Sequence, residues 1–375
     1  MENNFSRGNL SFRDKLLALD YVLIFLILLL GLISLFAMYS TEQGNFGYYT
    51  LSHLYRFCVF FVLFLLISFL SINFWYKSAY IFYLIILILL ISTYFYGITA
   101  SGSKRWIGLF FINLQPSELM KVSLIIFLAR YYYKIPIEHA TNIKYIITPI
   151  FVLFVPVLLV AIQPDLGTAV LILMGGAGVI WLTGFRVKYF LYTLFVSICL
   201  IPVGISFLKP YQKSRILTFF NPDRDPLGAG YQIIQSKIAI GSGGFFGKGY
   251  LKGTQSYLEF LPEKHTDFIF TLFSEEFGFL GSIILMLLYI LLISRVISIG
   301  FSVRSYFAKL YCFGFASAIF LYVFVNIAMV LGMLPIVGAP LPIMSYGGSS
   351  MLSIMLGLSI VMSCKIYSQD QISHY

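Results

Sequence analysis

The chain has 375 residues, of which 59% are hydrophobic and only 11% are charged. An ordinary soluble domain carries about 25% charged residues, and a soluble core of this size could not bury so much Phe, Ile and Leu without exposing large apolar patches. The composition excludes a soluble enzyme, a disordered chain and a coiled coil, and predicts an all-α polytopic membrane protein. The net charge of +10 does not indicate nucleic acid as a partner, because the sequence has no run of five or six basic residues.

Ten apolar segments are long enough to cross a membrane, since a spanning helix needs about 20 apolar residues. In chain order they are 20–39, 55–72, 78–97, 115–132, 145–162, 166–184, 188–207, 268–294, 306–332 and 345–366. The fourth segment is interrupted near its start by Glu118 and Lys121, and only Gln163, Pro164 and Asp165 separate the fifth from the sixth. We expect one membrane domain that covers residues 1–375.

Basic residues predict the orientation of these spans. With the N-terminus inside, the short outer loops hold only Arg56, Lys104 and Arg105. The short inner segments hold thirteen basic residues: Arg7, Arg13, Lys15, Lys77, Arg130, Lys134, Lys144, Arg186, Lys188, Arg295, Arg304, Lys309 and Lys365. This asymmetry follows the positive-inside rule, and ten spans then place both termini in the cytoplasm.

The segment 208–267 is left as one long extracytoplasmic loop between the seventh and eighth spans. A loop longer than about 15 residues is usually functional or disordered. This one alternates glycines with apolar residues such as Ile233 and Ile238. We interpret it as a segment that folds back onto the membrane surface with short amphipathic helices.

Several acids have ordinary structural explanations. Asp20 lies at the start of the first span and can cap it. Asp165 follows a proline at the start of the sixth span, where an N-cap and a functional role are both open. Glu275 and Glu276 lie two turns deeper than Asp267 and do not share its helix face, which favours hydrogen bonding inside the bundle.

Glu118 and Lys121 are three residues apart, so on a helix they share a face and can pair. Charged residues at membrane depth are costly and often functional. A structural ion pair that holds spans together and a functional pair are both compatible with this spacing.

Asp267 is the acid with the strongest functional signal. It lies at the outer mouth of the eighth span, where apolar residues follow it and three ionisable residues precede it, Glu263, Lys264 and His265. A carboxylate at a boundary between water and lipid can have a raised pKa and act as a general base. The alternative is an N-cap of the eighth span.

Several bases and one aromatic residue share the expected outer side with Asp267: Arg105, Trp106, Lys121, Arg215 and Lys264. Cations beside a membrane cleft suit an anionic head group such as a lipid diphosphate. The sequence contains no Walker loop, HExxH or GxSxG motif. ATP-driven transport, metalloproteolysis and serine hydrolysis therefore have no support.

These residues belong to longer motifs that cover nearly the whole chain. The motifs are Lys104-Arg105-Trp106-Ile107, Gln115-Pro116-Ser117-Glu118, Gln163-Pro164-Asp165-Leu166-Gly167, Asp225-Pro226-Leu227-Gly228-Ala229-Gly230-Tyr231-Gln232, the segment 261–270, Gly338-Ala339-Pro340-Leu341-Pro342 and Ser345-Tyr346-Gly347-Gly348-Ser349-Ser350. With them the chain resembles the SEDS family (shape, elongation, division and sporulation).

The resemblance implies a peptidoglycan glycosyltransferase of the bacterial cytoplasmic (inner) membrane, which polymerises lipid II on the outer face during cell-wall elongation. It also implies a class B penicillin-binding protein as transpeptidase partner, together with other proteins of the elongation complex. On the family's motifs Asp267 matches the essential acid and Trp106 a functional aromatic residue. The residues we expect to bind substrate are Arg105, Trp106, Glu118, Lys121, Gln163, Asp165, Arg215, Glu263, Lys264, His265, Ser349 and Ser350.

In the expected reaction Asp267 takes a proton from the 4-hydroxyl of the acceptor, which attacks the anomeric carbon of the donor. The leaving group is a polyprenyl diphosphate, so no general acid is required, and cationic side chains or a divalent ion (Mg²⁺ or Mn²⁺) would stabilise it. No other cofactor is indicated. Two alternatives are a lipid II flippase and a non-catalytic scaffold for the partner synthase.

Overall fold

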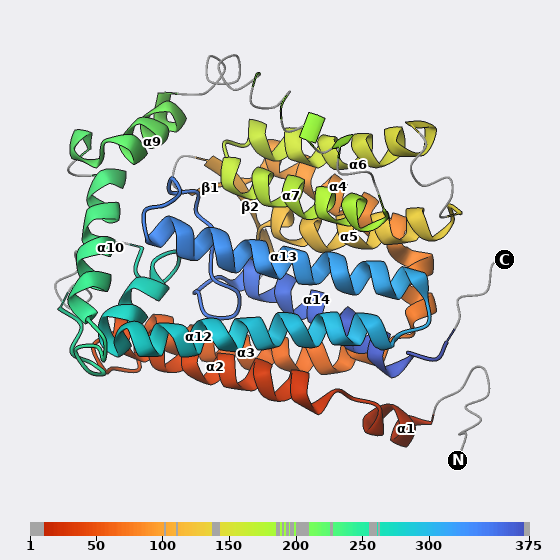
Figure 1. Ribbon diagram of the computed structural model, residues 1–375, viewed down its shortest axis with the longest axis horizontal. Coiled ribbons are helices and arrows are strands. Elements are labelled where there is room, and N and C mark those ends of the chain that lie inside the picture. The colour runs from red at the N-terminus through yellow and green to blue at the C-terminus, as the bar shows by residue number, and fades with distance from the viewer. Residues whose placement is uncertain are drawn as a thin grey trace.

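Long helices lie side by side along the molecule, with both chain ends at one end of the bundle and α9 and α10 at the opposite end (Figure 1). This is a computed structural model, and it describes residues 11–100, 103–109, 112–136, 143–184, 210–225, 228–254 and 263–370, together with residue 261 and a few positions between 188 and 199. The α-helices are α1 (Phe12–Leu17), α2 (Tyr21–Thr41), α3 (Tyr48–Ser68), α4 (Ile72–Tyr96), α5 (Pro116–Tyr133), α6 (Ile143–Ile162), α7 (Leu166–Leu182), α9 (Pro210–Phe220), α10 (Ala229–Gly243), α12 (Ile269–Ser302), α13 (Tyr306–Val330) and α14 (Gly348–Ile366).

Within the described residues, seven helices are long and apolar enough to cross a membrane: α2, α3, α4, α6, α12, α13 and α14. Helix α7 is apolar but shorter, and α5 carries Glu118 and Lys121 in its first turns. The expected seventh span, 188–207, lies largely outside the described residues. The chain is thus a polytopic helical membrane protein. Helices α9 and α10 appear where short helices were expected in the segment 208–267.

The all-α prediction was wrong for the connection between α4 and α5. Three short strands, β1 (Ile98–Ala100), β2 (Ser103–Leu109) and β3 (Ile112–Leu114), form an antiparallel sheet in the order β1-β2-β3. Buried or constrained backbone needs partners for its N–H and C=O groups, and the sheet supplies them over strands too short to show a clear alternation in the sequence. Strand β2 carries Arg105 and Trp106, and Trp106 pairs with Ile98 of β1.

Helix α3 begins earlier than the expected second span because an acid from the preceding connection caps it. The carboxylate of Glu42 accepts hydrogen bonds from the backbone N–H groups of Tyr49 at 3.0 Å and Thr50 at 2.7 Å. The free N–H groups of a helix start are thereby satisfied. A capping side chain is recognised in a sequence when it lies within about four residues of the N–H groups that it caps. Glu42 lies farther from Tyr49 and Thr50 than that.

Helices α13 and α14 are the most buried of the spans, and α14 packs on α3 and α5 while α13 packs on α12 and α7. Small residues allow close helix approach in a membrane: a Cβ atom on Gly357 of α14 would lie 2.1 Å from the ring of Phe315 on α13. At the start of α2, Asp20 accepts from the backbone N–H of Leu23 at 2.9 Å, which confirms the expected cap. It also accepts two hydrogen bonds from the guanidinium of Arg295 on α12.

Candidate active site

Asp267 lies in the turn that precedes α12, and its side chain does not cap that helix. The N-cap is Phe268, without a side-chain hydrogen bond, so the N-cap alternative for Asp267 was wrong. The carboxylate faces the connection between α13 and α14, since a Cβ atom on Gly338 would lie 3.5 Å from Oδ2 of Asp267.

Three hydrogen bonds hold the backbone of residues 265–267, which carries this carboxylate. The side-chain amide of Asn326 donates to the carbonyl oxygen of Asp267 at 2.9 Å. The hydroxyl of Ser345 donates to the carbonyl oxygen of Thr266 at 2.6 Å, and the N–H of Tyr346 donates to that of His265 at 2.8 Å. The turn is therefore tied to α13 and to the start of the α14 segment before any substrate binds.

Arg105, Asp165 and Arg215 lie within electrostatic range of Asp267. The guanidinium of Arg105 pairs with the Asp165 carboxylate at 3.2 Å. Asp165 also accepts from the backbone N–H of Thr168 at 3.2 Å, so its expected capping role is confirmed. The guanidinium of Arg215 donates to the carbonyl of Ile336 at 3.2 Å. Helix α9, the sheet and the start of α7 thus converge on one acid.

Burial, together with these charges, raises the pKa of the Asp267 carboxyl to about 7. Burial is the largest cause, the negative charge of Glu263 adds to it, and the cations Arg215 and Arg105 oppose it. A carboxylate with a pKa near the ambient pH can both accept and release a proton. This is the electrostatic property that a general base requires.

Glu118 and Lys121 form a sealed cluster. The Lys121 ammonium lies 2.7 Å from Oε1 of Glu118 and 4.0 Å from the ring centroid of Tyr322, whose hydroxyl donates to Oε2 of Glu118 at 2.7 Å. The cavity beside Lys121 has a volume of about 10 Å³, which is room for one water at most. In this arrangement the pair supports the contact of α5 with α13, and its expected contact with substrate stays a prediction.

Other expected site residues also hold the walls of the site together. The Gln163 amide donates to the carbonyl of Leu90 at 2.9 Å, which links α6 to α4. The Ser349 hydroxyl donates to the carbonyl of Asn113 at 2.9 Å, which links α14 to β3. His265 stacks on Tyr49 with ring centroids 4.0 Å apart.

The remaining expected residues differ in their exposure. Glu263 is exposed and accepts from the hydroxyl of Thr266 at 2.8 Å. Lys264 and Ser350 are buried, and Trp106 is partly buried on β2. Glu263 and Lys264 belong to the turn that carries Asp267, Trp106 belongs to β2, and Ser350 belongs to the first turn of α14.

Sequence reasoning missed Asn326, Ser345 and Tyr346 as supports of the Asp267 turn. Ser345 and Tyr346 belong to a motif that was noted, but their backbone partners are distant in sequence. Asn326 had a detectable signal. It is a lone amide inside an apolar span, and such polar residues are costly in a membrane unless they have partners.

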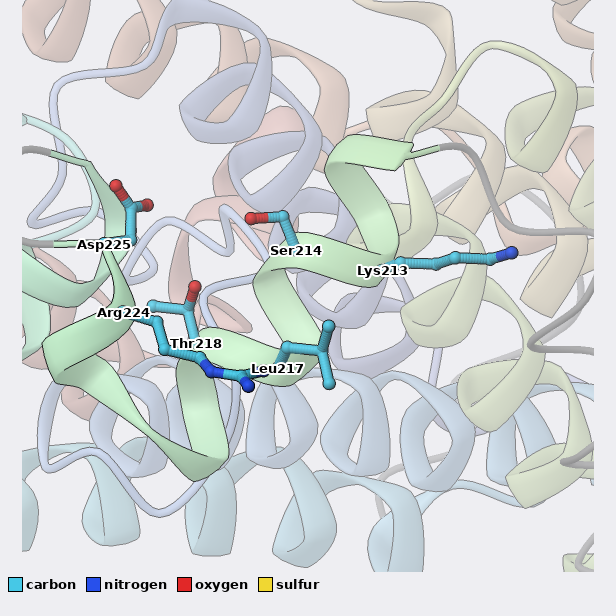
Figure 2. A pocket seen from close by; sticks show the side chains of 6 residues that line it. All are labelled: Lys213, Ser214, Leu217, Thr218, Arg224 and Asp225. Atoms are coloured by element: carbon cyan, nitrogen blue, oxygen red, sulfur yellow. The ribbon is translucent and has the colours of Figure 1, made fainter.

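A cavity of about 440 Å³ lies between α9 and the short helix η2 (Pro222–Arg224). Its lining is polar apart from one leucine: Lys213, Ser214, Leu217, Thr218, Arg224 and Asp225 (Figure 2). None of the expected site residues lines it. Helix α9 links this cavity to the Asp267 site, because it lines the cavity and also carries Arg215.

The described residues contain no group of three or more His, Cys, Asp or Glu side chains that could hold a metal ion. Mg²⁺ is commonly bound by one or two carboxylates together with substrate phosphates. Asp267 and Asp165 are the acids that fit such a shared arrangement.

A bundle of apolar helices long enough to span a membrane, with one acid of raised pKa beside cations, defines a polytopic helical membrane protein. A family model described as a cell cycle protein, for FtsW, RodA and SpoVE, matches residues 16–370. The chain belongs to this family, which confirms the resemblance seen in its motifs.

Individual relatives agree with this assignment. The chain is 45% identical over 285 residues to the peptidoglycan glycosyltransferase MrdB of Escherichia coli K12, which covers 75% of this chain and 76% of MrdB. A chain from a peptidoglycan synthase complex that coordinates polymerization and crosslinking superposes with a TM-score of 0.81 at 31% identity, covering 94% of this chain and 99% of the other. The rod shape determining protein RodA of Thermus thermophilus gives a TM-score of 0.72 at 27% identity, with 94% and 99% covered.

Proposed function

We propose that this chain is a peptidoglycan glycosyltransferase of the bacterial cytoplasmic membrane, which polymerises lipid II into glycan strands on the outer face during cell-wall elongation. Its relatives carry that activity in their names. The single observation in this molecule that carries the proposal is Asp267, an acid with a pKa near 7 in a backbone-fixed turn among cations.

The proposed step is one displacement. Asp267 takes the proton of the acceptor's 4-hydroxyl as its oxygen forms a bond to the donor's anomeric carbon. The bond from that carbon to the diphosphate oxygen breaks, and its electron pair leaves with the polyprenyl diphosphate. The centre inverts from α to β, so one acid suffices, unlike glycosidases that need two carboxyl groups.

The departing diphosphate carries negative charge that cations at the site can stabilise. Arg105 and Arg215 act on the Asp267 carboxyl electrostatically, and their guanidinium groups can bind phosphate oxygens in a bidentate way. A divalent ion would be held mainly by the diphosphate, with Asp165 or Asp267 as protein ligand.

The partner we propose is a class B penicillin-binding protein, which would crosslink the strands that this chain makes. The support is the superposition on a chain from a synthase complex that coordinates polymerization and crosslinking. Other proteins of the elongation complex are proposed on the same basis.

The test is polymerisation of fluorescent lipid II by the purified protein and its Asp267→Asn variant, with a transpeptidase-inactive partner present. Loss of a general base costs about 10²–10⁴-fold in rate. Asp223→Asn is the matched control, since Asp223 is an exposed acid in η2. Undiminished polymer from Asp267→Asn would remove the base assignment.

Two further outcomes separate the rival functions. Transfer of labelled lipid II across empty liposomes, without polymer, would indicate a flippase. Polymer that appears only when a separate glycosyltransferase is added, and that does not depend on Asp267, would indicate a scaffold.

A further inference from the structure

Helix α12 is broken where it meets the glycine-rich outer segment. Gly278 has φ +65° and ψ −160°, outside the helical region. After the break, the N–H of Phe279 donates to the carbonyl of Gly244 at 2.9 Å, and the N–H of Leu280 donates to that of Phe245 at 3.1 Å. In an unbroken helix both donors would bond to carbonyls four residues earlier in α12.

Those earlier carbonyls are satisfied by the same outer segment. The N–H of Lys248 donates to the carbonyl of Glu275 at 3.0 Å, and the N–H of Gly249 donates to that of Glu276, also at 3.0 Å. The segment 244–249 is therefore inserted into α12. It supplies acceptors to one half of the helix and donors to the other.

The insertion depends on backbone contacts that leave no space for side chains. A Cβ atom on Gly247, whose φ is +82°, would lie 2.0 Å from the carbonyl oxygen of Glu276. One on Gly278 would lie 2.3 Å from the nitrogen of Gly247. Glycine at both positions lets the two backbones meet.

A partly buried ion pair fastens the inserted segment. Oε1 of Glu275, whose side chain is fully buried, lies 2.7 Å from the Lys248 ammonium. The same oxygen accepts from the N–H and the hydroxyl of Thr254 at 2.8 and 2.9 Å. Glu275 thus binds both ends of the segment 248–254.

We propose that the Lys248–Glu275 pair is a positioning lock that sets the angle of the half-helix 269–277 and, through it, the place of Asp267. This rests on the proposed function. The half-helix begins two residues after Asp267, so a rotation at the Gly278 break moves the turn that carries the carboxylate. Neither lock residue touches the substrate in this proposal.

The kinetic test compares Lys248→Met, Glu275→Gln and the double variant with the unaltered protein, each measured with its partner present. A small misplacement of a catalytic group can cost about 10²-fold in rate. We expect kcat to fall by about 10–100-fold for Lys248→Met, with KM changed less than about twofold. The pH midpoint of the rate should also shift, because Asp267 moves relative to Arg215 and Glu263. The double variant, which leaves no unpaired buried charge, should recover part of the loss.

Lys252→Met is the matched control, since Lys252 is an exposed lysine of the same outer segment. If the pair had only a structural role, its variants would have lower thermal stability and a lower active fraction, but kcat per folded molecule and the pH midpoint of the rate would be unchanged. That result would overturn the proposal.

A distance measurement separates this inference from the proposed function. Spin labels at Glu263, in the turn before α12, and at Phe301, near the far end of α12, report the position of the turn in a Cys58→Ser/Cys199→Ser background, while kcat is measured on the unlabelled proteins. We expect Lys248→Met to change or broaden the measured distance, even if no variant makes polymer. An unchanged distance, or a changed distance with unchanged kcat in an active protein, contradicts the lock.

Discussion

The amide of Asn326 bridges two backbone carbonyls, donating to Asp267 at 2.9 Å and to Ala339 at 2.6 Å. Both donors come from one fully buried NH₂ group on α13. The catalytic candidate is therefore fixed through its main chain, and its carboxylate remains available for a reacting group.

Asn326→Asp should remove these hydrogen bonds while it keeps the size and shape of the side chain, because a carboxylate cannot donate to two carbonyls. We expect a loss of about 1–3 kcal/mol in stability and a larger fall in kcat than in substrate affinity. Thermal unfolding and steady-state kinetics measure the two effects. Ser359→Ala is the control, since its hydroxyl donates only within α14.

The rate of polymerisation should depend on pH through Asp267. A general base must be ionised, so the rate should rise with pH and reach half its maximum near pH 7, the pKa of this carboxyl. Initial rates between pH 5 and 9, at saturating substrate, provide the measurement. A rate that is flat through this range would argue against Asp267 as the base.

Neighbouring charges should move that midpoint in opposite directions. Glu263→Gln removes a negative charge that raises the pKa of Asp267, so the midpoint should fall. Arg215→Met removes a cation that lowers it, so the midpoint should rise. The same pH series tests both variants, and shifts of one sign in both would refute this electrostatic account.

Asp20 and Arg295 should contribute to stability and not to catalysis. Arg295→Met leaves a buried carboxylate without its cation, while Asp20→Asn keeps an oxygen that can cap α2. We expect Arg295→Met to lower the melting temperature more than Asp20→Asn, with kcat per folded molecule unchanged in both. An equal loss would mean that the buried Asp20 carboxylate costs little when its cation is absent, contrary to this account.

Gly278→Ala should prevent correct assembly of α12. Its φ of +65° and the nearby Gly247 nitrogen exclude a Cβ atom, so we expect a loss of more than about 3 kcal/mol or no folded protein. Gly241→Ala, at a helical position with open space, should be neutral or slightly stabilising. Size-exclusion profiles in detergent and thermal unfolding compare the pair.

The sequence predicted the helical membrane class, which the structure confirms. It also singled out Asp267, because an apolar chain with few charges leaves few explanations for each acid, and the role of Asp267 stays a prediction. The sequence did not predict the cap that Glu42 provides for α3, since the conformation of the turn between them cannot be derived from the sequence. The sheet between α4 and α5 was missed because its strands are too short to show a period.

The site could be predicted only as a set of residues. Spacing along a helix could not reveal that Glu118 pairs with both Lys121 and Tyr322, because Tyr322 comes from a distant span. Likewise, Glu275 was expected to form hydrogen bonds in the bundle interior, and it does. Its partner Lys248, however, belongs to the outer segment.

In a helix that spans a membrane, the backbone N–H and C=O groups normally bond to one another within that helix. Helix α12 differs, because four of its backbone groups are satisfied by the segment 244–249. That segment precedes α12 in the chain, so it is already synthesised when α12 emerges. The segment 244–249 thus completes the hydrogen bonds of a helix long enough to span the membrane, and we expect a deletion that shortens it to impair membrane insertion of α12.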